Sequence, residues 1–261
     1  MMEDLWARVR VYNPQADEDK LWFGFRFAMS AHEGQLRRSG QPYFVHALTV
    51  ASILADLRLD VDTLIAAMVH DVVEDTEYEL EDIRQRFGKD VAHMVDGVTK
   101  MSGIRAVSAD ARKAETYRKL VLAIAQDPRT VLIKLADRLH NMRTISFLPP
   151  DRQIDIAQET MDVYAPLANR FGIAKIKWEL EDLAFKVLQP ERYFEVEAGI
   201  HQTRAERERL IEKIVEPLRT QLGEAGIECQ ISGRAKHFYS IYRKMKAQDI
   251  GLDRVLSLIH I

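Results

Sequence analysis

The sequence predicts a mainly α-helical protein. Over most of the 261 residues, apolar side chains recur at the spacing that places them on one face of a helix. Glycine and proline interrupt these stretches at points where a helix would end. One stretch, Ile227 to Ile231, instead alternates apolar and polar residues as a strand does. We therefore expect a helical protein whose C-terminal part begins a small α/β region.

The composition excludes several classes of protein. Hydrophobic residues make up 47% of the chain, enough for one ample core or for one domain with part of another. A net charge of -3 lacks the overall basic character of proteins that bind duplex nucleic acid. No stretch resembles a signal peptide or a transmembrane helix, and the single cysteine, Cys229, expected as a half-buried strand residue, fits a reducing compartment. We expect a cytoplasmic protein without a membrane partner.

The first predicted helix runs from Glu18 to Glu33, where Gly34 provides a stop. A basic loop, Gln35 to Pro42, contains a glycine and a proline and cannot continue the helix. Helical spacing returns from about Val45. This second helix carries His46 at its start.

A central segment that begins near Leu64 is apolar on almost every side, and we expect one buried helix from there to Thr76. An aspartate-rich start at residues 60–62 resembles its N-terminal cap. Two ionisable pairs, His70-Asp71 and Glu74-Asp75, lie within two turns of this helix. Because a buried carboxylate is costly unless it is paired, protonated or bound to a metal, these pairs indicate a metal site.

Seven further elements are expected downstream, joined by turns and by a mobile loop at Met101 to Asp110. A loop of this kind can act as a lid where it faces a pocket. They are helices over residues 80–87, 89–99, 109–127 and 131–144, a helix over 151–170 with a kink at Pro166, a helix over 174–188, and a long, charged, solvent-exposed helix over 194–222. After the strand at Ile227 to Ile231, helical spacing returns from Phe238 to Met245.

Four side chains form the predicted ligand set: His46, His70, Asp71 and Asp137. They come from three predicted helices, and a metal held between His70 and Asp71 would be closed by the other two. Nitrogen and oxygen donors suit Mn²⁺, Fe²⁺ or Zn²⁺, and the absence of thiolates argues against a structural zinc site. Such a set leaves room for water.

Polar residues beside the ligands supply the rest of the predicted site. Glu74 and Asp75 each lie four residues after a ligand, where a carboxylate can orient a water or move its proton. Asp137, Asn141 and Thr144 share one helix face by their spacing. A ligand beside the metal would therefore meet an amide and a hydroxyl.

Other basic residues give weaker indications of a binding role. The run at residues 37–40, which contains Arg37, Arg38 and Ser39, suits phosphates or a nucleobase, although a charged loop is usually just solvated. Arg138 and Arg143 are expected to point away from the site and to form ion pairs.

Together these residues resemble the RelA/SpoT homologue family, the enzymes that make and degrade the alarmones ppGpp and pppGpp in the stringent response. The ligand set matches that of the HD superfamily, and the resemblance covers about Ala31 to Lys246. The supporting runs are residues 37–43 (RRSGQPY), 70–76 (HDVVEDT), 95–100 (VDGVTK), 134–144 (KLADRLHNMRT), 164–168 (YAPLA) and 178–185 (WELEDLAF).

The resemblance implies an all-α HD hydrolase that binds Mn²⁺ and removes pyrophosphate from the 3′ position of ppGpp, leaving GDP. Members that have lost this activity have a degraded His-Asp pair, which is intact here. By resemblance, Arg37 packs on guanine, and Arg38 and Ser39 border the nucleotide. Asn141 and Thr144 contact its sugar and phosphate side, while Glu74 and Asp75 activate or position the water.

The last part resembles the start of the family's synthetase domain, which transfers pyrophosphate from ATP to GDP or GTP. Residues 233–246 match its nucleotide-gripping segment. The residues expected to meet phosphates there are Arg234, Lys236, His237, Ser240 and Lys244. Ser257 stands where the family has an aspartate that binds Mg²⁺, so we expect no alarmone synthesis and interpret the end at Ile261 as a truncation or an aberrant terminus.

The resulting organisation has three parts. We expect an HD hydrolase domain over residues 1–195 with a metal-binding core at about 44–145, a connecting helix over 196–223, and an incomplete α/β synthetase fragment over 224–261. The ribosome and other regulators are expected to act only through regions absent here. Two alternatives stay open: an HD phosphohydrolase acting on other nucleotides, such as dNTPs or cyclic nucleotides, and a regulatory fragment that binds a nucleotide without turnover.

Overall fold

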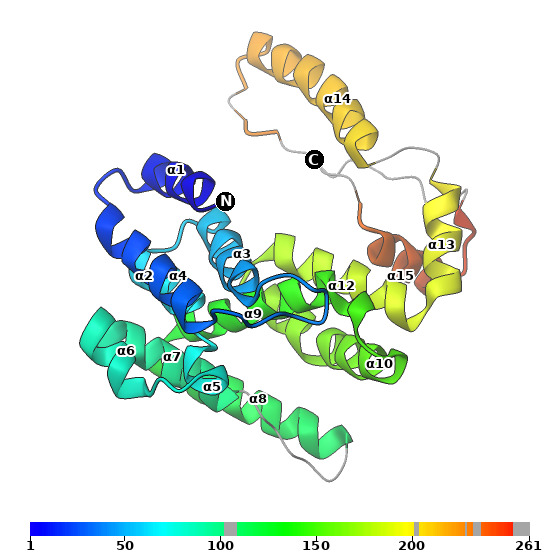
Figure 1. The fold of residues 1–261 in the computed structure, drawn as a ribbon. Helices are drawn as coiled ribbons and strands as arrows, with labels where there is room; N and C mark the ends of the chain where they lie inside the picture. Colours follow the sequence, from blue (N-terminus) through cyan, green and yellow to red (C-terminus); the bar gives the residue numbers. More distant parts are fainter. Residues whose placement is uncertain (102–108, 201–203, 228, 232–235, 253–261) are drawn as a thin grey trace. The chain divides into compact units, whose positions relative to one another are not determined.

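The computed structural model describes residues 1–101, 109–200, 204–227, 229–231 and 236–252. The chain divides into two compact units, Met1–Leu180 and Glu181–Ile261. Every regular element of the described residues is a helix (Figure 1), which confirms the predicted mainly α fold. The sequence-based domain limits at 195 and 223 remain a prediction, because units defined by contacts need not coincide with domains of separate function.

The helices of the first unit match the predicted ones except at Met2–Tyr12, where none was predicted, and in the central segment, where two helices replace one. They are α1 (Met2–Tyr12), α2 (Glu18–Ala31), α3 (Tyr43–Asp56), α4 (Val61–Met68), α5 (Val72–Asp75), α6 (Leu80–Phe87), α7 (Lys89–Met101), α8 (Ala109–Gln126), α9 (Pro128–Arg143), a 3₁₀ turn (Ile145–Phe147), α10 (Pro150–Glu159), a π-helical turn (Thr160–Tyr164) and α11 (Ala165–Arg170). The π-helical turn ends just before Pro166, where the sequence predicts a kink. Residues 102–108 of the predicted loop lie outside the described residues.

The core around the site is formed by α3, α4 and α9, and α3 packs against both of the others (Figure 1). Helix α4 is buried on all sides, since every residue from Thr63 to Met68 is buried. Its apolar composition explains this burial, because no face offers water a polar surface. Gly97 on α7 allows close packing against α9, since a Cβ there would lie 2.7 Å from Thr130 Cγ2.

Two aspartates begin the helices that lead to the site. Asp60 accepts a hydrogen bond from the Thr63 backbone N–H (3.0 Å) at the start of α4. Asp127 accepts one from the Arg129 backbone N–H (2.9 Å) at the start of α9. The Arg129 guanidinium contacts both carboxylates, at 2.7 Å from Asp127 and 3.4 Å from Asp60. The predicted cap at residues 60–62 is therefore confirmed and is tied to the cap of α9.

The single helix predicted from Leu64 to Thr76 is wrong. Helix α4 ends at Met68, and His70 and Asp71 lie in a turn before α5. The His70 ring nitrogen Nδ1 lies 2.8 Å from the Ala67 carbonyl oxygen, the group that would accept the Asp71 N–H in a continuous helix. The imidazole thus bonds one of the last carbonyl oxygens of α4, and the His-Asp pair lies outside the helix.

The second unit contains the end of α12 (Ala174–Leu188), α13 (Pro190–Gly199), α14 (Arg204–Glu224) and α15 (Phe238–Gln248). Its described core joins Val196 and Ile241. The continuous charged helix expected over 194–222 is wrong, because α13 ends at Gly199, a residue with low helix propensity.

The predicted strand is also not formed. Ile227 and residues 229–231 have no regular structure, and Cys229 is exposed rather than half-buried. A strand needs a neighbour for its backbone hydrogen bonds, and the described residues provide no pairing for this segment.

Candidate metal centre

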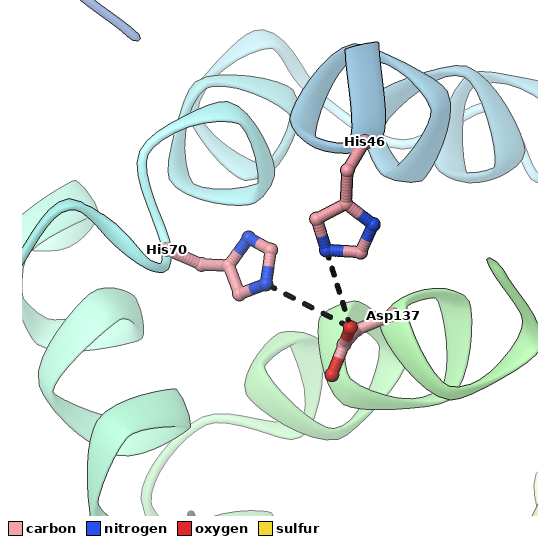
Figure 2. A group of neighbouring side chains, drawn as sticks. All are labelled: His46, His70 and Asp137. Carbon is pink, nitrogen blue, oxygen red and sulfur yellow. Dashed lines mark ion pairs between the residues drawn. The ribbon is translucent and has the colours of Figure 1, made fainter. Parts of the chain in front are cut away.

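Three buried side chains converge at the junction of α3, α4 and α9. His46 comes from the first turn of α3, His70 from the turn after α4, and Asp137 from the middle of α9 (Figure 2). Their donor atoms all lie within 4.8 Å of one another. Asp137 Oδ1 lies 3.4 Å from His46 Nε2 and 4.0 Å from His70 Nε2. The structure thus brings together three of the four predicted ligands in one buried cluster.

Asp71 completes this set at its more exposed side. Its carboxylate oxygens lie 3.1 Å from His70 Nε2 and 3.6 Å from His46 Nε2. Its side chain is 20% exposed, compared with 1% for each histidine. Asp71 therefore lies against both histidines at the more open side of the cluster formed by His46, His70 and Asp137.

The chemistry of this donor set fits a divalent cation. A carbonyl oxygen only accepts, so His70 Nδ1 must donate its proton to the Ala67 carbonyl, and the Nε2 lone pair is left free. That Nε2 atom is buried and has no hydrogen-bond partner among the described residues. Ligands about 2.1 Å from one ion are roughly 3 to 3.5 Å apart, which is close to the separations observed here. A bound cation would satisfy the nitrogen and neutralise the carboxylates.

Asp137 is held ionised in spite of its burial. Asn141 Nδ2 donates to Oδ1 (2.7 Å), and Lys134 Nζ lies 3.1 Å from Oδ2. Burial acts to raise the pKa of Asp137, but the charge of Lys134 and the neighbouring histidines hold it well below its usual range. The pKa of Asp71 is likewise lowered, because the adjacent imidazoles of His70 and His46 outweigh its burial. Both side chains are ready to bind a cation.

Tyr43 links the ligand Asp71 to the predicted catalytic carboxylate Asp75. Its hydroxyl lies 2.6 Å from Asp71 Oδ2 and 2.8 Å from Asp75 Oδ2, so one proton is shared between two acceptors. Burial and the two carboxylates raise the pKa of Tyr43, which keeps the phenol protonated. The other predicted catalytic carboxylate, Glu74, is also on α5 and is exposed.

The predicted substrate-binding loop forms a tight turn beside the cluster. Gly40 donates to the Arg37 carbonyl oxygen (2.8 Å) with a positive φ of 80° that glycine adopts readily. Arg38 is exposed, and Ser39 is half-buried. The Arg37 guanidinium points back to the site, where its Nη2 donates to Asn141 Oδ1 (2.7 Å).

The Arg37 guanidinium also contacts two histidines. Arg37 Nη1 lies 2.9 Å from His46 Nδ1 and 3.0 Å from His140 Nδ1. Burial and the electrostatic effect of His46 and of the Arg37 guanidinium lower the pKa of His140 to about 3, so this imidazole is neutral. Thr144, the last predicted substrate residue, directs its hydroxyl to the His140 carbonyl oxygen (3.1 Å) at the C-terminus of α9.

The two arginines that were expected to form ion pairs do so. Arg138 pairs with Glu159 (2.7 Å) and Arg143 with Glu179 (2.6 Å), which confirms their expected ion pairing. The synthetase-like residues Lys236, His237, Ser240 and Lys244 belong to the second unit, where Asp182 lies 3.2 Å from His237 Nδ1 and caps α15 through the Tyr239 N–H (2.9 Å). Arg234 lies outside the described residues.

Sequence reasoning missed Tyr43 and His140. A signal existed for both: Tyr43 is three residues before the ligand His46, and His140 is three residues after the ligand Asp137. On a helix, this spacing places each one on the face of its ligand. Neither a tyrosine nor a histidine needs to contact a metal ligand that lies on its helix face. The spacing alone therefore did not distinguish these two residues from aromatic residues of the core.

Comparison with known proteins agrees with this geometry. Residues 24–174 match the family model described as "HD domain", a range that includes all four predicted ligands. The chain belongs to the HD domain family. Its relatives place it among the RelA/SpoT proteins, as the sequence resemblance implies.

The relatives are much longer than this chain. The Escherichia coli K12 protein named bifunctional (p)ppGpp synthase/hydrolase SpoT is 46% identical over 258 residues, which cover 99% of this chain and 37% of the relative. The Myxococcus xanthus protein named GTP pyrophosphokinase is 45% identical over 254 residues, 96% of this chain and 34% of the relative. The chain therefore spans about a third of the length of the curated relatives that it matches.

A solved structure shares the helical fold. It is described as a metazoan ortholog of SpoT that hydrolyzes ppGpp, with 28% sequence identity and a TM-score of 0.52. The match covers 66% of this chain and 97% of that chain. Among the described residues of the present chain, no helix is both long and apolar enough to cross a membrane.

Proposed function

We propose that this chain is a metal-dependent hydrolase that removes pyrophosphate from the 3′ position of guanosine 3′,5′-bis(diphosphate) and leaves GDP. The observation that carries the proposal is the buried cluster of His46, His70 and Asp137, with its unpartnered Nε2 atom, in an HD domain. Relatives at 46% identity are named guanosine-3′,5′-bis(diphosphate) 3′-pyrophosphohydrolase. The cytoplasm is the proposed compartment, in line with the sequence.

Mn²⁺ is the proposed metal, held by His46, His70, Asp71 and Asp137. The nitrogen and carboxylate donors of this set suit it. When bound, such an ion lowers the pKa of a coordinated water and neutralises charge on a phosphoryl oxygen, which pyrophosphate ester hydrolysis needs. The protein positions the ligands through the Ala67 carbonyl, Asn141 and Lys134.

Glu74 and Asp75 are the proposed proton-handling groups. They follow the ligand turn on α5, and Asp75 is oriented by the Tyr43 hydroxyl. In hydrolysis, water attacks the phosphorus bonded to O3′, and the bond from that phosphorus to O3′ breaks. The water oxygen leaves with pyrophosphate, and O3′ takes up a proton. A carboxylate at the site accepts the proton that the water loses.

Arg37, Arg38, Ser39, Asn141 and Thr144 are the proposed substrate-binding residues. The edges of the Arg37 guanidinium are held by Asn141 and two histidines, and a planar guanidinium fixed at its edges can stack through its face. This supports packing on guanine. The synthetase-like residues Lys236, His237, Ser240 and Lys244 are proposed only as phosphate contacts of the second unit.

The proposal is tested by measuring pyrophosphate release from ppGpp with purified protein, with and without Mn²⁺. We expect Mn²⁺-dependent formation of GDP and its loss in the His70→Ala and Asp71→Ala variants, because each removes a ligand. Each variant should melt in the presence of a chelator like the wild-type protein, which excludes unfolding as the cause. Hydrolysis of dNTPs or cyclic nucleotides but not of ppGpp would contradict the proposed substrate. Metal binding without any hydrolysis would contradict the proposed enzymatic activity.

A further inference from the structure

A contact between two ring nitrogens lies directly behind the metal centre. His46 Nδ1 is 2.7 Å from His140 Nδ1, and both imidazoles are buried. Arg37 Nη1 lies 2.9 Å from the first and 3.0 Å from the second. The three nitrogens therefore form a triangle with each side at hydrogen-bond distance.

A hydrogen bond across the 2.7 Å contact between the two imidazole nitrogens has two possible directions. Arg37 only donates, and a single proton can lie between the two imidazole nitrogens. Either His46 Nδ1 donates to His140 Nδ1, or His140 Nδ1 donates to His46 Nδ1. Arg37 Nη1 faces both nitrogens but can donate only to the one that keeps its lone pair, so its contact with the protonated nitrogen is not a hydrogen bond.

Only one of these arrangements permits metal binding. If His46 carries its proton on Nδ1, its Nε2 lone pair faces Asp71 and Asp137. If His46 accepts at Nδ1, a neutral ring must carry its proton on Nε2, which then has no lone pair for a metal. Which of the two Nδ1 atoms accepts the hydrogen bond therefore decides whether His46 Nε2 can bind a metal.

The other histidine shows how this choice is normally made. A backbone carbonyl of Ala67 sets the tautomer of His70, because a carbonyl can only accept. Within the part of the chain that the structure describes, the His46 ring has no such hydrogen bond with a carbonyl, and His140 Nδ1 occupies the corresponding place. Groups in this position fix the tautomer and the ring orientation of metal-bound histidines.

We propose that His140 is a positioning residue that accepts the Nδ1 proton of His46 and so holds His46 as a metal ligand. This inference rests on the proposed metal site but not on the identity of the substrate. His140 does not touch the reacting atoms in this role. Its effect is on metal affinity and on the orientation of His46.

The test compares Mn²⁺ affinity, measured by calorimetry without nucleotide, for the wild-type protein and two variants. His140→Leu removes the acceptor, and we expect about 10- to 100-fold weaker binding, the usual loss for groups that orient a ligand. His140→Asn is the matched control, because its amide oxygen can accept near the position of Nδ1. We expect it to retain affinity within about threefold of wild type. Unchanged affinity in His140→Leu would overturn the proposal.

A second measurement does not depend on whether the variants fold. In the ¹⁵N-labelled wild-type protein loaded with Zn²⁺, the hydrogen bond should give a scalar coupling between His46 Nδ1 and His140 Nδ1. A rapidly exchanging Nδ1 proton without that coupling would overturn the proposal. If Mn²⁺ binds and His140→Leu weakens it while ppGpp is not cleaved, only the proposed function fails. If the wild-type protein binds neither metal, both proposals fail.

Discussion

At the scale of one residue, the Tyr43 hydroxyl determines how two carboxylates of the site are oriented. It bonds Asp71 and Asp75 at once, and its ring stacks on His32 with centroids 4.4 Å apart. A phenylalanine would keep the ring contact and lose only the hydroxyl. Tyr43 therefore offers a clean separation of packing from hydrogen bonding.

We predict that Tyr43→Phe binds Mn²⁺ about 10-fold more weakly than wild type, because Asp71 loses the donor that orients it. Titration calorimetry without nucleotide measures this. Tyr12→Phe is the control, since it removes a tyrosine hydroxyl that bonds a backbone carbonyl, that of Leu59 (2.8 Å), outside the metal centre. Equal affinities for the two variants would show that the Tyr43 hydroxyl has no positioning role.

At the scale of elements, the site depends on where α4 and α9 begin. The two aspartate caps and Arg129 join the starts of these helices, and the helices then present His70 and Asp137. Burial acts to raise the pKa of Asp60, but hydrogen bonds from Thr63 and the charge of Arg129 lower it. A carboxyl whose pKa is lower in the folded protein stabilises it above the ordinary pKa of about 3.9, and the stabilisation is lost as the pH falls.

We predict that Asp60→Ala lowers the free energy of unfolding at pH 7 by about 1 kcal/mol, because the cap is lost. Asp60→Asn keeps a capping oxygen but removes the charge. Its stability should therefore fall less than that of wild type between pH 5 and pH 3. Urea unfolding at several pH values measures both effects. Parallel curves for wild type and Asp60→Asn would contradict a role for the ionised carboxylate.

At the scale of the whole molecule, all four proposed ligands belong to the first unit. A ligand that binds only the folded form stabilises it by about 2.7 kcal/mol when its concentration is 100 times Kd. We expect this stabilisation in the segments that carry the ligands, namely α3, α9 and the turn after α4.

We predict that Mn²⁺ slows amide hydrogen exchange in these three segments and leaves α13 and α15 of the second unit unchanged. Exchange followed by mass spectrometry measures this, and the His70→Ala variant should show no change. Equal protection in α13 and α15 would mean that metal binding stabilises both units together.

Much of this molecule was accessible from local sequence patterns. Helical spacing predicts most of the helices of the first unit within a few residues, because apolar residues that recur on consecutive turns mark the buried face of each helix. The chemistry of His46, His70, Asp71 and Asp137 also indicates a metal site before any geometry is known, since charged groups in an apolar segment need a partner.

The tertiary structure decided what depends on contacts between distant segments. Spacing does not reveal that the central helix ends at Met68, or that the His70 imidazole bonds the Ala67 carbonyl there. The contact of His140 with His46 joins residues 94 positions apart, and it exists only because α3 packs on α9. The expected strand at Ile227 had a correct alternating pattern but no described partner. Local periodicity thus determines which residues are helical and apolar, whereas hydrogen-bond partners, tautomers and strand pairing are set by what the folded chain places beside them.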